Sequence, residues 1–450
     1  MVSKLDLKIY TAREIPCIPQ LARLGPARVR DMQIVASVLP FRVNNYIIEQ
    51  LIDWSAAPDD PIFRLVFPSR EMLDEASFAR MAYLHDGAIG DAQQAAAAIR
   101  ARLNPHPADQ LSMNRPFFAG ERVTGLQHKY PQTVLFFPSE GQTCHSYCTF
   151  CFRWPQFVRD RDLRIAMSDR DVLMGYLRSH PEVSDLLITG GDAFTMKARR
   201  LRLFLEPLIE PGLRHVTTIR FGTKALSFWP YRFVTDPDVN ELMEVLEWLV
   251  RHGKHVAVMA HYNHWRELST DIAQAAIYRL QQTGAEIRSQ GPLLRGINDD
   301  PLVWSTLWQR QVQLGIVPYY MFVPRDTGPK YYFDVPLARA WSIYADAARR
   351  VSGLGRTVRG PSMSAGPGKI EITGIATING SRVFVLRFLQ SRDPDWSFRP
   401  FFAEYDDAGT WLDDLKPAFG EPAFFFASQY HAMLDAEQDR PALQPAIAIA

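Results

Sequence analysis

Cysteine is scarce in this chain of 450 residues, and long apolar runs are missing altogether. The four cysteines are too few for the disulfide framework of a small secreted protein. No run of 18 or more apolar residues occurs, which excludes a membrane-spanning helix of the usual length. The first 20 residues contain no apolar region typical of a secretory signal. We therefore expect a soluble, cytoplasmic protein that has no membrane partner.

The chain also lacks an excess of charge of either sign. Its 50 Lys and Arg residues balance 49 Asp and Glu residues, so the formal net charge is +1. No overall field attracts nucleic acid or an anionic membrane, and we expect no nucleic-acid partner. With 47% hydrophobic residues, a chain of this length can bury a large core and has room for one large domain with additions.

Three of the four cysteines, Cys144, Cys148 and Cys151, lie within eight positions of one another. In a reducing compartment this spacing permits a zinc site with His145, an iron–sulfur cluster with one iron unligated by protein, or incidental buried cysteines. Structural zinc sites usually take their ligands in two separated pairs, and no second group of Cys or His follows here. A four-iron cluster suits one short loop, because each thiolate binds a different iron. The spacing therefore favours the cluster.

The three cysteines are separated by three residues and then by two, and Phe150 comes directly before the last of them. This pattern resembles that of radical S-adenosylmethionine (SAM) enzymes. The resemblance implies a [4Fe-4S] cluster bound by Cys144, Cys148 and Cys151, whose open iron binds SAM. It also implies that Phe150 takes part in cofactor binding and that a flavodoxin- or ferredoxin-type protein donates the electron.

Six short runs of β-branched and aromatic residues alternate with helix-like segments, which predicts a parallel sheet in an α/β fold. For a radical SAM enzyme the expected form of this sheet is a partial (βα)6 barrel. The cysteines follow the first run, where α/β folds of this kind place their chemistry. The runs are TVLFFP from residue 133, DLLITGGD from 185, HVTTIRFG from 215, HVAVMAHY from 255, AEIRSQG from 285 and VPYYMFVP from 317.

We expect three regions: a mostly helical N-terminal region over 1–120, the barrel over 121–330 and a C-terminal region over 331–450. Alternating residues around Asn379-Gly380 predict a β-hairpin in the last region, and the final RPALQPAIAIA predicts a loose tail. Within the barrel, Ser168 is the expected N-cap of the first helix.

The turn Gly190-Gly191-Asp192 follows the second predicted strand. One interpretation is a tight turn in which Asp192 or Thr195 caps a helix, and the other is a close approach of bare backbone to a ligand. In a radical SAM enzyme this turn meets the methionine part of SAM, so the resemblance favours the second.

Several separate stretches resemble one family, the lysine 2,3-aminomutases. These radical SAM enzymes also use pyridoxal 5′-phosphate (PLP) and move an α-amino group to the β-carbon. The stretches occur in the family's order across residues 35–390. They are LPFRVNNYI, DDPIFRLVFPS, HKYPQTVLFF, CHSYCTFCFR, LLITGGDAFT, IRFGTK, AHYNH, PLLRGINDD, VPYYMF and AGPGKI.

The resemblance assigns roles to individual residues. Arg153 matches the arginine that binds the substrate carboxylate, and Lys369 matches the lysine to which PLP is covalently bound. Asp299 matches one of two aspartates that hold the ε-ammonium group of lysine. The remaining cofactor-binding positions are Gln290 and the PLP-phosphate pair Lys129 and Tyr130.

The chain departs from the family's pattern at several positions. Thr133 stands where the family has a second phosphate-binding arginine, and Ser362 stands where it has the second aspartate. FRWPQF replaces a run of arginines near the last cysteine, and the C-terminus lacks the cysteines that hold zinc in some lysine enzymes. We therefore expect no such zinc site, and a substrate other than lysine or in addition to it.

The sequence thus predicts a radical SAM aminomutase, an isomerase that acts on a small-molecule amino acid or related substrate and forms a homo-oligomer. One alternative keeps the cluster and SAM without PLP, for a dehydrogenation, an epimerisation or another rearrangement, such as one in natural-product biosynthesis. The other alternative is a non-catalytic iron–sulfur or zinc protein that uses the fold as an interaction scaffold.

Overall fold

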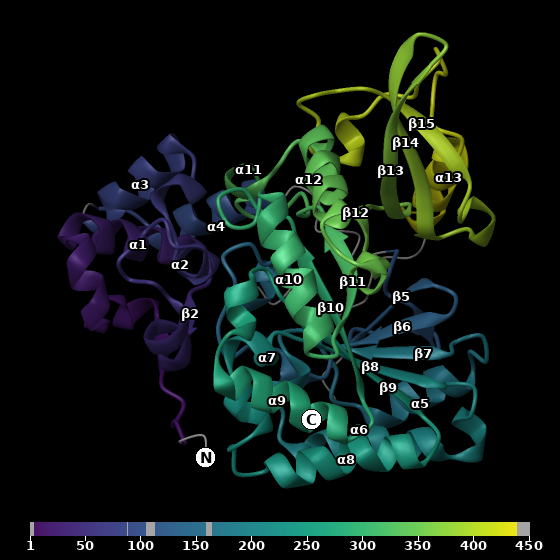
Figure 1. The fold of residues 1–450 in the computed structure, drawn as a ribbon, viewed down its shortest axis with the longest axis horizontal. Coiled ribbons are helices and arrows are strands. Elements are labelled where there is room, and N and C mark those ends of the chain that lie inside the picture. The colour runs from purple at the N-terminus through teal and green to yellow at the C-terminus, as the bar shows by residue number, and fades with distance from the viewer. Residues whose placement is uncertain (1–3, 88, 105–112, 159–163, 439–450) are drawn as a thin grey trace.

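One sheet of 11 strands runs through most of the molecule (Figure 1). The computed structural model describes residues 4–87, 89–104, 113–158 and 164–438. The strand order is β15-β14-β13-β12-β11-β10-β9-β8-β7-β6-β5, and every neighbouring pair from β6 to β12 is parallel. The fold is therefore α/β with a large mixed sheet.

All six strands expected from the sequence are present, and a seventh parallel strand, β12, follows them. Each is a short run of β-branched or aromatic residues that ends at a turn. The parallel strands are β6 (Thr133–Phe136), β7 (Asp185–Ile188), β8 (Thr218–Thr223), β9 (His255–His261), β10 (Glu286–Pro292), β11 (Val317–Phe322) and β12 (Arg359–Ser364).

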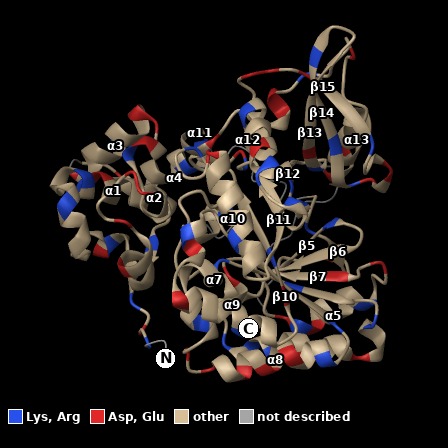
Figure 2. Ribbon diagram, in the orientation of Figure 1, with Lys and Arg blue, Asp and Glu red and all other residues tan. Residues whose placement is uncertain are grey.

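Helices connect the parallel strands and bury one face of the sheet. In α8, buried residues recur with the period of a helix, while Glu244 and Glu247 face outward (Figure 2). In β8 the residues alternate between buried and partly exposed, so the face away from the helices stays accessible. The connecting helices are α5 (Arg170–Arg178), α6 (Ala198–Leu205), α8 (Val239–Arg251), α9 (Asp271–Gln282), α10 (Pro301–Gln313) and α12 (Leu337–Arg349).

The expected cap of the first of these helices was wrong by one residue. Asp169, and not Ser168, is the N-cap of α5, since its carboxylate accepts hydrogen bonds from the backbone N–H groups of Asp171 and Val172. An ionised carboxylate is a stronger acceptor than a hydroxyl and also interacts favourably with the helix dipole.

Antiparallel strands flank the parallel part on both sides. On one side lies β5 (Leu126–Tyr130), and on the other lie β13 (Gly368–Ile378), β14 (Ser381–Ser391) and β15 (Pro400–Glu404). The hairpin predicted at Asn379-Gly380 joins β13 to β14, and both turn residues have positive φ angles, 49° and 81°. The predicted loose tail lies outside the described residues.

The N-terminal region packs beside the sheet around a hydrophobic core of its own (Figure 1). This core also contains Trp154, Phe228 and Trp229, which belong to the segments that follow β6 and β8. The region is thus attached to that end of the sheet. Its main elements are β1 (Ile9–Thr11), α1 (Pro26–Val38), β2 (Arg42–Asn44), α2 (Pro61–Val66), α3 (Glu75–His85) and α4 (Ala92–Leu103).

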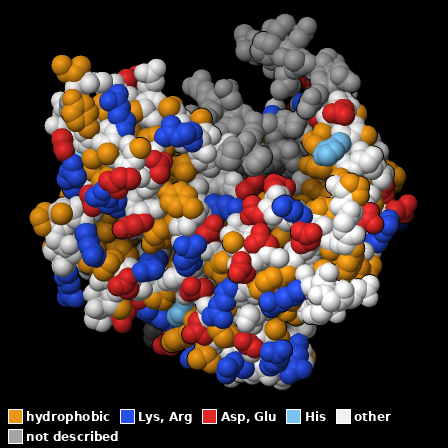
Figure 3. Space-filling model, turned by 90° about the horizontal axis from the view of Figure 1, so that it is seen from above, with side chains coloured by type: hydrophobic (Ala, Val, Ile, Leu, Met, Phe, Trp, Pro, Cys, Tyr) orange, Lys and Arg blue, Asp and Glu red, His pale blue; other side chains and the backbone are white. Residues whose placement is uncertain are grey.

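Charged side chains of both signs are interspersed over the face of the molecule seen in Figure 3. None of the helices in the described ranges is long and apolar enough to span a membrane.

Two leucines of α6 test how much this helix contributes to stability. Leu201 is 1% exposed in the main core, whereas Leu203 on the same helix is 41% exposed. We expect Leu201→Ala to lower the free energy of unfolding by about 2–5 kcal/mol, because it removes buried contacts and leaves a cavity. Leu203→Ala should change it by less than about 1 kcal/mol. Urea denaturation measures both, and equal losses would contradict this packing.

Candidate functional site

The cysteine loop, residues 141–157, follows β6 and is held by a strand from the N-terminal region. Arg42 of β2 donates from Nη1 to the hydroxyl of Thr143 at 2.7 Å. Asn44 donates from Nδ2 to the carbonyl oxygen of His145 at 3.2 Å. An irregular loop that is partly buried needs such partners for its polar groups. Sequence reasoning missed both Arg42 and Asn44, which lie about a hundred residues before the loop.

Two further segments hold the middle and the end of the cysteine loop. The backbone N–H of Thr149 donates to Leu65 of α2 at 2.9 Å. The indole N–H of Trp154 donates to the hydroxyl of Thr327, which follows β11, at 3.0 Å. The loop is therefore bound on both sides, and its shape is fixed by contacts distant in sequence.

The structure places the thiols of Cys144, Cys148 and Cys151 within electrostatic reach of one another. Burial raises the pKa of all three, that of Cys151 to about 11, and neighbouring thiol charges raise those of Cys144 and Cys148 further. Bound metal stabilises the thiolate form of such groups. The donor set therefore fits a metal cluster.

His145, the fourth ligand of the zinc alternative, is buried, and its burial lowers its pKa to about 3. Within the described ranges, no three His, Cys, Asp or Glu side chains form a group that could hold a metal ion. Neither the three cysteines alone nor the three together with His145 therefore form such a group in the described residues, and the case for a cluster depends on the spacing and chemistry of the thiols.

The turn Gly190-Gly191-Asp192 at the end of β7 packs directly against the cysteine loop. The backbone N–H groups of Gly191 and Asp192 both donate to the carbonyl oxygen of Gly141, at 3.2 and 3.1 Å. A Cβ atom on Gly191 would lie 2.2 Å from the carbonyl oxygen of Thr143, which no side chain tolerates. Glycine is therefore required here for contact between two backbone segments.

The carboxylate of Asp192 is buried and joins the ends of β7 and β8. It accepts hydrogen bonds from the hydroxyl of Thr223 and the backbone N–H of Lys224 at 2.8 Å, and from Phe194 N–H at 3.0 Å. Burial raises its pKa to about 6, against the effect of these hydrogen bonds. The helix-cap interpretation is thus seen in the structure, and a role of Asp192 toward SAM stays a prediction.

The three residues assigned to PLP lie close to one segment of chain. Lys129, at the end of β5, donates from Nζ to the carbonyl oxygen of Ala365, four residues before Lys369. Tyr130 follows directly and has its ring 5.6 Å from the Lys129 ammonium. The structure therefore brings together residues that are about 240 positions apart in sequence.

Lys369, near the start of β13, has its ammonium group over aromatic rings. Its Nζ lies 4.1 Å from the centroid of Tyr320 and 3.4 Å from the amide oxygen of Gln390. Burial, helped by the positive charges of neighbouring arginines, lowers the pKa of Lys369 to about 8. A larger share of neutral amine is present near pH 7 than for an exposed lysine, which suits a nucleophile.

Arg153 is 8% exposed, and in the described part of the chain its Nη1 has no hydrogen-bond partner. Its guanidinium lies over the rings of Phe137 and Phe152, at 4.4 and 5.0 Å. Burial and the nearby charge of Arg325 lower its pKa to about 9. A buried cation with an unused donor is suited to an anion such as a carboxylate.

Arg325 is another residue that sequence reasoning missed. It stacks on Phe152 at 5.0 Å and donates from Nη2 to the carbonyl oxygen of Ser364 at 2.8 Å. It comes just after the VPYYMF stretch but forms no recognisable motif with it, so only the fold places it near Lys369.

The remaining predicted residues lie in different surroundings. Gln290 of β10 pairs in register with Tyr320 of β11, whose ring contacts the Lys369 ammonium. Phe150 lies elsewhere and packs edge-on against Phe333, with the ring centroids 6.2 Å apart. Asp299 accepts a hydrogen bond from the backbone N–H of Gly296 at 3.0 Å within its own loop. No described contact joins Asp299 to the other predicted site residues.

Ser362 and Thr133, two of the residues at which the chain differs from the family's pattern, form hydrogen bonds with neighbouring groups. The hydroxyl of Ser362 is fully buried and lies 3.4 Å from the carbonyl oxygen of Met321. The hydroxyl of Thr133 is 3.3 Å from a carboxylate oxygen of Asp185.

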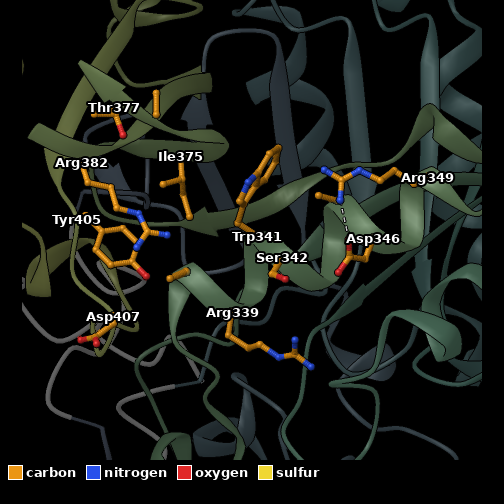
Figure 4. A pocket seen from close by; sticks show the side chains of 13 residues that line it. Arg339, Trp341, Ser342, Asp346, Arg349, Ile375, Thr377, Arg382, Tyr405 and Asp407 are labelled. Carbon is orange, nitrogen blue, oxygen red and sulfur yellow. Dashed lines mark hydrogen bonds and ion pairs between the residues drawn. The ribbon is translucent and has the colours of Figure 1, made fainter. Parts of the chain in front are cut away.

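A separate pocket of about 620 Å³ lies between α12 and the β13–β14 hairpin (Figure 4). Its charged residues are partly paired with neighbours: Arg349 binds Asp346, and Arg382 stacks on Tyr405 at 3.7 Å. It is lined by none of the residues predicted for the site.

The chain is similar in sequence to several aminomutases. It is 32% identical, over 87% of this chain and 92% of the other, to a protein of Aquifex aeolicus named "Putative L-lysine 2,3-aminomutase". It is 28% identical to L-lysine 2,3-aminomutase of Bacillus subtilis, over 67% of this chain and 59% of that protein. Glutamate 2,3-aminomutase of Clostridioides difficile is 29% identical over 45% of this chain and 46% of its own length.

No family model matches the chain. A solved structure of Streptococcus suis SuiB bound to S-adenosylmethionine is 14% identical and covers 60% of this chain and 56% of its own, with a TM-score of 0.35. At that score the likeness supports no further statement.

The lowered pKa of Lys369 is open to a direct test. With a pKa of about 8, about a tenth of its amine is neutral at pH 7, against about one part in 3,000 for an unperturbed lysine of pKa near 10.5. In competitive acetylation followed by peptide mass spectrometry, we expect labelling of Lys369 to rise with pH and level off above about pH 9. Labelling of the lysine in an unstructured peptide added to the same sample, with the ordinary pKa near 10.5, should continue to rise beyond pH 10. Parallel profiles for the two lysines would contradict the lowered pKa.

Proposed function

Because the chain belongs to the lysine 2,3-aminomutase family of radical SAM enzymes, we propose that it is a PLP-dependent amino acid 2,3-aminomutase. The observation that carries this proposal is the partly buried Lys369, which lies beside aromatic rings and follows a backbone segment to which Lys129 donates a hydrogen bond. A PLP enzyme needs a partly neutral lysine in a water-poor site.

The cysteine loop fits the iron–sulfur cluster that the family implies. Cys144, Cys148 and Cys151 would hold three irons, and the turn at Gly190 and Gly191 packs against the same loop, as a SAM-proximal turn must. A cluster held by these cysteines, together with SAM, would supply the radical chemistry that acts at the substrate β-carbon. The hydrogen bonds that fix the loop would keep this chemistry in a constant position.

PLP, when bound, supplies a conjugated ring that carries the migrating amino group. On the protein side, Lys369 would bind the cofactor through its neutral amine, and Arg153 would bind the substrate carboxylate with its unused donor. Phe152 and Phe137 would exclude water from that ion pair, which strengthens it.

The substrate is proposed to be an amino acid other than lysine or in addition to lysine. Ser362 offers no charge to an ε-ammonium group, and the carboxylate of Asp299 already accepts a backbone hydrogen bond. An ammonium group that is half-paired in a closed site costs on the order of several kcal/mol. A substrate whose side chain carries no such ammonium group is therefore favoured.

One observation favours the second candidate, a radical SAM enzyme that works without PLP. Thr133 replaces a phosphate-binding arginine and is bonded to Asp185, so this position adds no positive charge for a phosphate. Loss of a cation at a phosphate site weakens binding of the cofactor.

Further properties expected from the family are proposals as well. These are curvature of the parallel strands into a partial (βα)6 barrel, the three regions 1–120, 121–330 and 331–450, binding of SAM by Asp192, Phe150 and Gln290, an external flavodoxin- or ferredoxin-type donor, and a homo-oligomer.

Cysteine substitutions and product analysis test the proposal together. Oxygen-free, iron-reconstituted protein should hold about four irons per chain, and Cys144→Ala, Cys148→Ala or Cys151→Ala should lose most of them. Cys17→Ala is the matched control, because Cys17 is exposed and lies outside the loop. Reduced protein with SAM, PLP and a panel of amino acids should yield β-amino products by mass spectrometry. SAM cleavage without β-amino products, and without PLP on Lys369 after borohydride, would favour the second candidate.

A further inference from the structure

Thr133 stands at the position of the family's second phosphate-binding arginine, so this position supplies no positive charge to a phosphate. Thr133 is bonded to Asp185, which also forms an ion pair with Arg220 at 2.5 Å. If PLP binds, its phosphate therefore needs positive charge from elsewhere in the fold.

Three cationic side chains converge on consecutive carbonyl groups just before Lys369. Arg325 donates to the carbonyl oxygen of Ser364 at 2.8 Å, and Lys129 donates to that of Ala365. Arg392, which follows β14, donates from Nε to the carbonyl oxygen of Gly366 at 2.9 Å. The three residues come from three different parts of the chain, near β5, β11 and β14, so only the tertiary fold assembles them.

The same three cations also act on Tyr130, the other residue predicted to bind the PLP phosphate. Lys129 lies 5.6 Å from its ring, and the charges of Arg325 and Arg392 both act on its hydroxyl. The charge of Arg325 also acts on Lys369 and on Arg153. The charge of Arg325 therefore reaches both Lys369, the proposed PLP lysine, and Arg153, the residue proposed to bind the substrate carboxylate.

We propose that Arg325 and Arg392, together with Lys129, form the phosphate site of PLP in this chain and replace the cation missing at Thr133. This inference rests on the proposed use of PLP. Three cations that bind one turn concentrate positive charge beside Lys369, and such a place attracts a phosphate dianion. A guanidinium also matches the geometry of a phosphate, to which it can donate two parallel hydrogen bonds.

The segment that these cations hold, Ser364 to Gly368, consists of small residues and proline. A Cβ atom on Gly368 would lie 2.4 Å from the carbonyl oxygen of Gln390, so this glycine is required for the approach of β14. The phosphate site and Lys369 are thus parts of one rigid turn between β12 and β13. Their spacing is set by five residues of backbone.

The test compares PLP with pyridoxal, which lacks only the phosphate. Each is titrated into the wild-type protein and variants, and capture is followed by absorbance and by borohydride trapping on Lys369 with peptide mass spectrometry. We expect Arg325→Gln to weaken PLP binding by about 10- to 100-fold, since it removes charged hydrogen bonds. Its binding of pyridoxal should change by less than about threefold. Arg325→Lys should recover part of the preference for PLP, because it restores the charge without the fork.

Arg359→Gln is the matched control. Arg359 lies near Lys369 and stacks on Tyr319 at 4.9 Å, but it donates to none of the three carbonyl groups. It should leave the ratio of PLP to pyridoxal affinity unchanged. Arg392→Gln gives an independent measurement and should lower the ratio as Arg325→Gln does.

Two outcomes overturn the inference and are distinguishable. If the wild-type protein traps PLP on Lys369 and prefers it to pyridoxal, but Arg325→Gln and Arg392→Gln keep that preference, then this phosphate site is wrong and PLP use stands. If the wild-type protein traps neither compound on Lys369, then the proposed function fails and the inference fails with it.

Discussion

The arrangement of the site depends on the hydrogen bonds between β2 and the cysteine loop. The loop has almost no regular secondary structure, yet much of its backbone is removed from water. Its polar groups must therefore find partners elsewhere, and Arg42 and Asn44 supply them from the N-terminal region. Asn44 also donates to the carbonyl oxygen of Phe228, so one amide joins the loop to α7 (Ala225–Phe228), the short helix that follows β8. The loop, the glycine turn and the sheet are thereby fixed relative to one another.

Much of the fold could be predicted because its signals are local. β9 reads HVAVMAH, a short apolar run between turn residues, and α8 repeats its buried residues with helical period. The first residue of α5 was harder to predict, because Ser168 and Asp169 are both good capping residues. Only the structure decides between them. The three cysteines were likewise found from their spacing alone.

The parts of the site that were missed depend on contacts between distant segments. Arg325 and Arg392 belong to no motif, and Arg42 lies in a matching stretch that gives it no role. An arginine in a sequence gives no sign of which carbonyl group it will meet. Asp299 lies in a matching stretch that suggests a substrate contact, and its carboxylate accepts a hydrogen bond within its own loop, so its role stays a prediction. Motifs thus name individual candidate residues, whereas the residues that contact those candidates come from the fold.

The contact between Asn44 and the cysteine loop has a consequence for biosynthesis. Residue 44 leaves the ribosome long before residues 145 and 228, whose carbonyl groups it must bind. The N-terminal region therefore cannot complete its native bonding until more than half of the chain has been made. During that interval the cysteine loop is not yet joined through Asn44 to the segment that follows β8, so the loop reaches its final arrangement only after residue 228 has been made.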